Sequence, residues 1–154
     1  VASISLKDIT QVFEIRSALE ELAAGLAAER ITSEEIETLE RMLVEIGDYM
    51  ENKDMESVVA ADVAFHEVLY KASRNERLAD IVHNLREQTY RFRSFSMNQP
   101  GRLRKTWEEH RQLVEAIAAH NAVQARKLAQ IHMEHSEQTL LQGMENAESF
   151  NTDL

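Results

Sequence analysis

The sequence predicts an all-α protein, an antiparallel bundle of about six helices. The 154 residues include one proline and four glycines, so few positions would interrupt a helix. Apolar residues recur at steps of three and four, which places them on one side of a helix. The breaks between these segments are short, and short connections place consecutive helices side by side in opposite directions. A chain of this length can form one domain with a substantial core.

The first two helices are predicted by this spacing and by a start signal. The first runs from about Asp8 to Arg30. Thr32 is followed three residues later by Glu35, the capping-box pattern that begins a second helix. Residues 51–54, with the sequence ENKD, form the turn that ends it. The stripes expected to face the core are Val12, Ile15, Leu19, Leu22 and Leu26 in the first helix, and Ile36, Leu39, Leu43 and Ile46 in the second.

Polar segments separate the remaining helices. SRNE ends the third helix, and the NQPGR loop, with adjacent Pro100 and Gly101, ends the fourth. Asn121 can cap the last helix, which extends beyond Leu141. The polar end of the chain, residues 149–154, is expected to fray. The third, fourth and fifth helices are predicted at residues 55–72, 77–97 and 103–119.

Charge and composition exclude several kinds of function. The formal net charge of −10 makes the domain a poor partner for nucleic acid, which requires clustered basic residues. We interpret two basic clusters, YRFR (90–93) and GRLRK (101–105), as solvated helix ends. The absence of cysteine excludes disulfides, thiolate metal sites and cysteine nucleophiles. No signal peptide or membrane-length apolar run is present, so we expect a cytoplasmic protein with no membrane partner.

The third helix carries polar residues on its apolar side. Asp62 and His66 are four residues apart and share a face with Phe65 and Leu69. A buried carboxylate is unstable unless it is ion-paired, hydrogen-bonded or bound to a metal ion. A local ion pair between Asp62 and His66 would satisfy this requirement, and so would a shared metal ion.

Histidines occupy similar positions in the last two helices. His110 stands in the middle of an apolar stripe, and His132 and His135 share a face with an apolar residue. If these helices converge with the third, one Asp and three His would surround a cavity and suit a divalent cation such as Zn²⁺, Ni²⁺, Fe²⁺ or Mn²⁺. Each histidine could instead be a hydrogen-bonded core residue. The apolar neighbours are Leu103, Trp107, Val114, Ile117 and Leu128.

The other histidines are expected outside this group. His83 falls off the apolar stripe of its helix and is predicted at the surface. His120 lies at the end of a helix, where a partly positive ring interacts favourably with the helix dipole. His135 could replace His132 as a ligand or support it through a hydrogen bond.

Four segments between about Asp8 and Leu141 together form a recognisable pattern. They are FEIRSALEELAAGLAAER, DVAFHEVLYKAS followed by RNERL, EEHRQLVEAIAAHNA, and ARKLAQIHMEHSEQTL. One contains an Asp-x-x-x-His pattern and another a Glu-His pair. With these segments in this order, the chain resembles the C-terminal effector-binding domain, or FCD domain, of GntR-type bacterial transcription regulators of the FadR branch.

The resemblance implies a metal site with one Asp and three His. Transferred to this sequence, these ligands are Asp62, His66, His110 and His132, with His135 as an alternate. Zn²⁺ is the first expectation, with Ni²⁺, Fe²⁺ or Mn²⁺ as alternatives. The last segment departs from the family because a methionine follows His132, where the family usually has leucine, and because His135 is an additional histidine.

The resemblance also implies a sensor rather than an enzyme. Such domains bind a small organic acid in the bundle cavity and control DNA binding by an N-terminal winged helix-turn-helix domain, as homodimers. Arg16 and Arg86 are candidates to bind the effector carboxylate, although Arg16 could instead form a structural ion pair with Glu20, one helical turn away.

The same family pattern predicts the organisation of the chain. Residues 1–7 would be the remnant of a linker from a missing DNA-binding domain, and residues 8–148 the effector-binding domain. Two functions of other classes remain as alternatives: a metal-dependent enzyme, with Glu109 or Glu134 near the ligands in sequence, and a structural helical interaction module.

Overall fold

The structure, a computed structural model, is a helical bundle, as the sequence predicts. It describes the backbone of residues 5–152 and the side chains of that range except 91, 94 and 147–152. The described residues form seven α-helices and no strand, and none of these helices is long and apolar enough to cross a membrane. The helices are α1 Leu6–Arg30, α2 Ser33–Glu51, α3 Met55–Ala72, α4 Glu76–Gln88, α5 Tyr90–Met97, α6 Arg102–Ala118 and α7 Ala122–Thr152.

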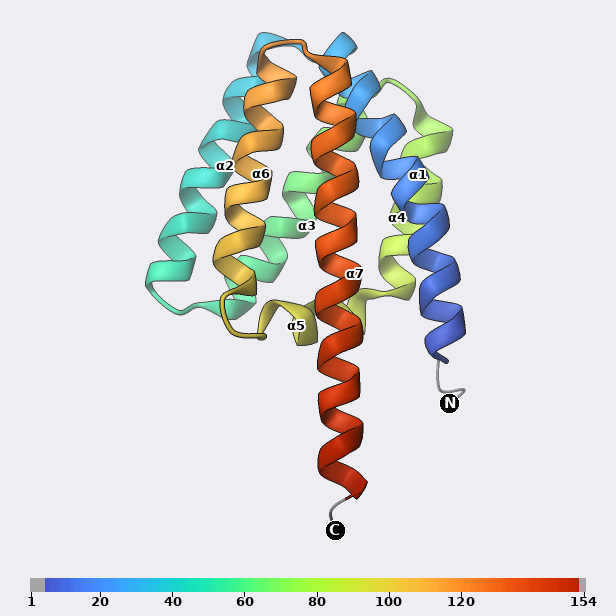
Figure 1. Cartoon of the computed structure of the whole chain (residues 1–154). Coiled ribbons are helices and arrows are strands. Elements are labelled where there is room, and N and C mark those ends of the chain that lie inside the picture. Colours follow the sequence, from blue (N-terminus) through green and yellow to red (C-terminus); the bar gives the residue numbers. More distant parts are fainter. Residues whose placement is uncertain (1–4, 153–154) are drawn as a thin grey trace.

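The long helices run alongside one another, and the short α5 lies across one end of the bundle (Figure 1). Helix α1 packs against α7, α3, α4 and α6, while α2 packs against α3 and α6. Helix α7 extends past the end of the other helices and continues to Thr152. Parts of the predicted linker remnant (residues 1–4) and of the predicted frayed tail (residues 153–154) lie outside the described residues.

Polar caps fix the helix boundaries. The predicted capping box is present at the start of α2, where the Thr32 side chain accepts a hydrogen bond from the Glu35 amide and the Glu35 side chain accepts one from the Thr32 amide. Asn121 caps α7, as predicted, by accepting from the Gln124 amide. These local bonds explain why the sequence locates helix starts well.

The fourth predicted helix, residues 77–97, is wrong as a single helix. Helix α4 ends at Gln88, and Thr89 adopts a non-helical conformation. The Thr89 hydroxyl donates hydrogen bonds to the carbonyls of Leu85 and Arg86, at 3.3 and 3.1 Å. A threonine hydroxyl competes in this way with the backbone bonds of a continuing helix. The chain therefore turns at Thr89, and α5 crosses the bundle instead of extending it.

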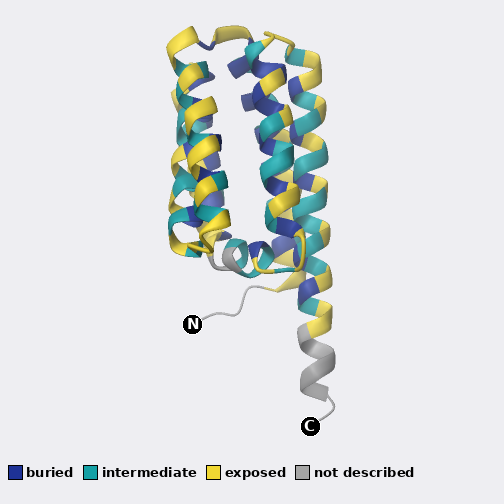
Figure 2. Ribbon diagram, turned by 90° about the vertical axis from the view of Figure 1, so that its left-hand side faces the viewer, coloured by how far each residue is buried: buried dark blue, intermediate teal, exposed yellow. Residues whose placement is uncertain are grey.

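The apolar core consists of two clusters of inward-facing residues (Figure 2). The larger cluster is built from α1, α2, α3, α4, α6 and α7, and includes Phe65, Leu39 and Ile117. The smaller cluster contains Ile9 and Phe13 of α1 with Met133 and Leu140 of α7, and Phe92 and Phe95 of α5 pack against it.

The first helix presents only part of the face predicted from its spacing. Its three predicted core leucines are partly buried and pack against the larger core cluster. Ile15, expected in the core, is 56% exposed. The buried face carries Arg16, Glu20 and several alanines instead. Alanines let α1 approach its neighbours closely, and the two charged residues belong to a buried polar network.

Glu20 is the carboxylate at the α1 end of this network. Its Oε1 atom accepts hydrogen bonds from Arg16 Nε at 3.1 Å and from the Tyr70 hydroxyl at 2.7 Å. Burial raises the pKa of Glu20, but the opposing effect of Arg16, His66 and Arg86 is larger and lowers it to about 2. Glu20 is therefore ionised in the folded protein at neutral pH.

We predict that Leu39→Ala lowers the free energy of unfolding by about 2–5 kcal/mol, because it leaves a cavity at a fully buried position of α2. Urea denaturation of the purified domain measures this. Val44→Ala is the matched control, since Val44 lies on the same helix and is 63% exposed. Equal destabilisation by the two substitutions would contradict this description of the core.

We predict that Glu20→Gln destabilises the domain at pH 7 by on the order of 3 kcal/mol. The folded-state pKa of Glu20 is about 2, below its ordinary value of 4.5, so its contribution is present above pH 4.5 and is lost as the pH falls toward 2. The difference from wild type should therefore narrow in urea titrations at successively lower pH. Glu29→Gln, at an exposed position of α1, should change little at any pH, and a pH-independent difference for Glu20→Gln would contradict the prediction.

Candidate metal and ligand site

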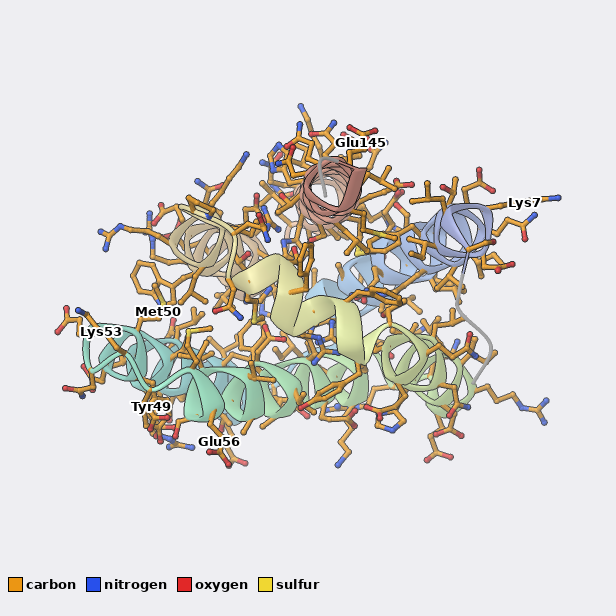
Figure 3. The ribbon with its side chains drawn as sticks, turned by 90° about the horizontal axis from the view of Figure 1, so that it is seen from below. Lys7, Tyr49, Met50, Lys53, Glu56 and Glu145 are labelled. Carbon is orange, nitrogen blue, oxygen red and sulfur yellow. The ribbon has the colours of Figure 1, made fainter. Side chains whose placement is uncertain are left out.

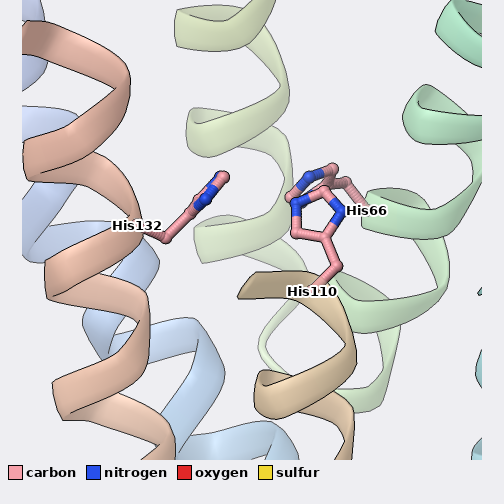
Figure 4. Close-up of side chains that lie close together, drawn as sticks. All are labelled: His66, His110 and His132. Carbon is pink, nitrogen blue, oxygen red and sulfur yellow. The ribbon is translucent and has the colours of Figure 1, made fainter. Parts of the chain in front are cut away.

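Three histidines from three helices converge inside the bundle. His66 of α3, His110 of α6 and His132 of α7 each offer a ring nitrogen, and these atoms all lie within 4.8 Å of one another. Figure 4 shows the three rings directed toward one point from their separate helices. The His110 ring stacks on Phe65 with 4.8 Å between ring centroids, which fixes its orientation.

Asp62 adjoins this group on α3. One carboxylate oxygen, Oδ1, lies 3.6 Å from His66 Nε2 and 3.7 Å from His110 Nδ1. The other, Oδ2, accepts a hydrogen bond from Arg86 Nη2 at 3.0 Å. The structure thus brings together the four side chains that the sequence singled out, Asp62, His66, His110 and His132.

The surrounding charges set the protonation of these groups. Burial raises the pKa of Asp62, but His66, Arg86 and His110 lower it further, so the pKa lies well below its ordinary value. Burial, together with Arg86, lowers the pKa of His66 to about 4 despite the opposing effect of Asp62. Burial likewise holds the pKa of His110 well below its ordinary value. At neutral pH the site therefore presents a carboxylate and neutral imidazoles, the forms that bind metal ions.

Glu109 of α6 links the two histidines of α7. Its two oxygens lie 2.6 Å from His132 Nδ1 and 2.5 Å from His135 Nδ1. Arg102, at the start of α6, donates to both Glu109 oxygens at 3.3 and 3.1 Å. Burial raises the pKa of Glu109, but hydrogen bonding from His132 and the charge of Arg102 lower it to about 2.

This arrangement separates the roles of the two α7 histidines. An ionised Glu109 accepts a hydrogen bond from the Nδ1–H group of His132, which leaves Nε2 as the ring nitrogen available to a metal ion. His135 contacts the other carboxylate oxygen of Glu109, Oε1, and its side chain is 30% exposed. It does not belong to the three-histidine group.

The donor set fits a divalent cation. Among the described residues, the Nε2 atom of His110 is buried and has no hydrogen-bond partner. An imidazole nitrogen without a partner in a buried site is unfavourable, and a metal ion would satisfy it. Three imidazoles and one carboxylate suit Zn²⁺ and other first-row divalent metals.

A cavity of about 60 Å³ lies beside the histidines, several times the ~10–15 Å³ that one water requires. Arginines from four helices reach its wall, and hydroxyl and apolar side chains complete it. Its lining residues are Phe13, Arg16, Asp62, His66, Arg86, Thr89, Phe92, Arg93, Ser96, Met97, Arg102, Thr106, His132, Ser136 and Leu140.

Both arginines selected from the sequence line this cavity, and each is held in an ion pair. Arg16 pairs with Glu20 at 3.1 Å, so the structural ion pair that was the alternative interpretation is present. Arg86 pairs with Asp62 at 3.0 Å.

The sequence interpretation missed two further arginines, Arg93 and Arg102. The two basic clusters that contain them were interpreted as solvated helix ends, which is wrong for these residues, whose side chains are 11% and 4% exposed. Arg102 and Glu109 stand seven residues apart, two helical turns on one face, and this spacing could have signalled their contact. Arg93 carries no such signal, because the break at Thr89 that directs it inward is not visible in the hydrophobic pattern.

Comparison with known proteins identifies the family of this chain. The FCD domain model matches residues 11–135. HTH-type transcriptional regulator LutR of Bacillus subtilis is 31% identical over 141 residues, covering 87% of this chain and 63% of LutR. The galactonate operon transcriptional repressor of Escherichia coli is 29% identical over 112 residues, covering 71% of this chain and 47% of the repressor.

A solved structure agrees with the fold. Escherichia coli McbR/YncC superposes with a TM-score of 0.83 at 22% identity, covering 92% of this chain and 72% of that chain. The chain spans about half to two thirds of the length of the two curated relatives, both of which are transcription regulators rather than enzymes. These matches confirm the resemblance drawn from the sequence: the chain belongs to the FCD domain family of GntR-type transcription regulators.

Proposed function

We propose that this domain is the ligand-sensing part of a transcription regulator, and that it binds a divalent metal ion and a small organic acid in the bundle cavity. One observation carries the proposal: the buried Nε2 atom of His110 has no partner among the described residues, and it stands where three imidazoles converge beside an ionised carboxylate. A purely structural polar core would be expected to satisfy that nitrogen.

Four side chains would hold the metal ion: Asp62, His66, His110 and His132. Zn²⁺ is the first candidate, because neutral imidazole and carboxylate ligands suit it, with Ni²⁺, Fe²⁺ and Mn²⁺ as alternatives. A bound divalent cation would supply a positive partner for a carboxylate. Glu109 would orient the His132 ring from behind, and His135 would share that support rather than coordinate the ion.

The charge of the cavity favours an anionic ligand. Four arginines reach it, Arg16, Arg86, Arg93 and Arg102. Three carboxylates pair with them, the buried Glu20 and Asp62 and the half-buried Glu109. The arginines therefore exceed the carboxylates by one, before any metal ion is counted. The small volume favours a short acid such as acetate. The E. coli relative is named for an operon of galactonate, which is a longer carboxylate.

Regulation would act through a DNA-binding domain outside this chain. Both curated relatives are transcription regulators, and LutR is named as an HTH-type protein. The net charge of −10 fits a domain that does not itself bind DNA. Ligand binding would shift the population of dimer geometries and so change the spacing of the two DNA-reading helices.

The first test is elemental analysis of the purified domain. We expect about one equivalent of divalent metal in the wild type and a loss of most of it in His110→Ala and His132→Ala, because each removes a ligand from the buried site. His83→Ala is the control, since His83 is exposed and pairs with Glu67 away from the site. His135→Ala should retain the metal, because His135 lies outside the three-histidine group.

Two results would change this assignment. Metal loss in His135→Ala with retention in His132→Ala would exchange the roles of these histidines. Failure of the wild type to retain Zn²⁺, Ni²⁺, Fe²⁺ or Mn²⁺ after loading would exclude the metal site and favour a structural helical module.

We predict that Glu109→Gln weakens metal affinity about 10–100-fold without abolishing binding, because the amide loses the charge that orients the His132 ring. Competition with a chromophoric chelator measures the affinity. Glu108→Gln is the matched control: Glu108 is the preceding residue and pairs with Arg111 on the exposed side of α6. An equal loss of affinity in both variants would show that the effect does not come from the contact with His132.

A further inference from the structure

The four arginines of the cavity differ in how completely their charges are neutralised. Arg16, Arg86 and Arg102 each have a carboxylate oxygen at 3.0–3.1 Å. Arg93 has only a longer contact, 3.7 Å from Nη1 to Asp62 Oδ2, and that oxygen already accepts a hydrogen bond from Arg86. Within the described part of the chain, Nη1 of Arg93 is buried and makes no hydrogen bond.

This unsatisfied donor faces the candidate ligand site. Arg93 lines the same cavity as His66 and His132. It lies near the Oδ2 oxygen of Asp62, whereas the imidazole of His66 lies near the Oδ1 oxygen. Burial lowers the pKa of Arg93 to about 10, and Arg86 adds to this effect. The guanidinium is still charged at neutral pH, its ion pair with Asp62 is long at 3.7 Å, and its Nη1 atom makes no hydrogen bond, so the site favours the binding of an anion.

The position of Arg93 in the fold distinguishes it from the other three arginines. It is carried by α5, an eight-residue helix, whereas Arg16, Arg86 and Arg102 lie on the longer helices α1, α4 and α6. Seen from below, α5 lies across the end of the bundle (Figure 3). An anion held by Arg93 would therefore connect α5 to the interior of the bundle.

We propose that Arg93 is the residue that anchors the carboxylate of the ligand, and that this contact fixes α5 over the cavity. The inference rests on the proposed function for the nature of the ligand, and it differs from the sequence prediction, which gave that role to Arg16 and Arg86. Those two side chains already have carboxylate partners, and binding a ligand would require them to exchange one partner for another. Arg93 has a free donor, and its planar guanidinium can donate two parallel hydrogen bonds to a carboxylate.

The test compares binding of acetate and of galactonate to Zn²⁺-loaded wild type, Arg93→Gln and Arg93→Lys by isothermal titration calorimetry. We expect at least a tenfold loss of carboxylate affinity in Arg93→Gln and a smaller loss in Arg93→Lys, which keeps the charge but not the paired donors. Acetamide, the neutral analogue of acetate, should bind weakly to all three proteins. Arg111→Gln is the control, because Arg111 is exposed and pairs with Glu108 and Glu115.

Metal content, measured on the same samples, separates this inference from the proposed function. Carboxylate binding of equal strength in wild type and Arg93→Gln, with metal retained in both, would overturn the role of Arg93 and leave the sensor proposal intact. Retained metal with no binding of either carboxylate by the wild type would overturn the anchoring role together with the acid-binding part of the proposed function.

A second measurement uses only the wild type, in case the variants do not fold. Amide hydrogen exchange in α5, residues 90–97, should slow when a saturating carboxylate is added, whereas exchange in an exposed segment such as the turn at residues 52–54 should not change. Unchanged exchange in α5 on carboxylate binding would overturn the proposal, because a ligand anchored by Arg93 must restrain the helix that carries it.

Discussion

The ionised carboxylate of Asp62, buried in the middle of a helical bundle, is the constraint on which the rest of the site depends. An uncompensated charge in that position would destabilise the fold strongly. The neighbouring helices supply its partners: Arg86 from α4, His110 from α6 and, at a longer distance, Arg93 from α5. Satisfying one carboxylate thus requires four helices to meet at a defined point.

The polar network also organises the apolar packing. Charged residues displace apolar ones from the buried face of α1, where Arg16 and Glu20 occupy two inward positions. The larger core cluster joins α1, α2, α3, α4, α6 and α7. The smaller cluster joins α1 to α7, and side chains of α5 pack against it. The cavity borders the smaller cluster, since its lining includes Phe13 and Leu140.

The site combines neutral imidazoles with charged arginines and carboxylates, and this combination suits reversible binding of an anion. His66 and His110 are neutral at neutral pH, because burial and the charge of Arg86 both lower the pKa of these imidazoles, and Asp62 is ionised. A metal ion and an acid would then enter a site whose charges are already set. Among the side chains that the structure describes, two buried polar atoms of this site have no hydrogen-bond partner, one on His110 and one on Arg93.

The sequence by itself determined the helical class, the helix starts at Thr32 and Asn121, and the four polar residues Asp62, His66, His110 and His132. These features depend on local spacing and capping, which the chain carries at short range. Only the tertiary structure decided the full buried face of α1 and the inward direction of Arg93, which result from competition between long-range packing and local preference. The break at Thr89 has a local cause in the hydroxyl hydrogen bonds, but the hydrophobic spacing of residues 77–97 does not record it.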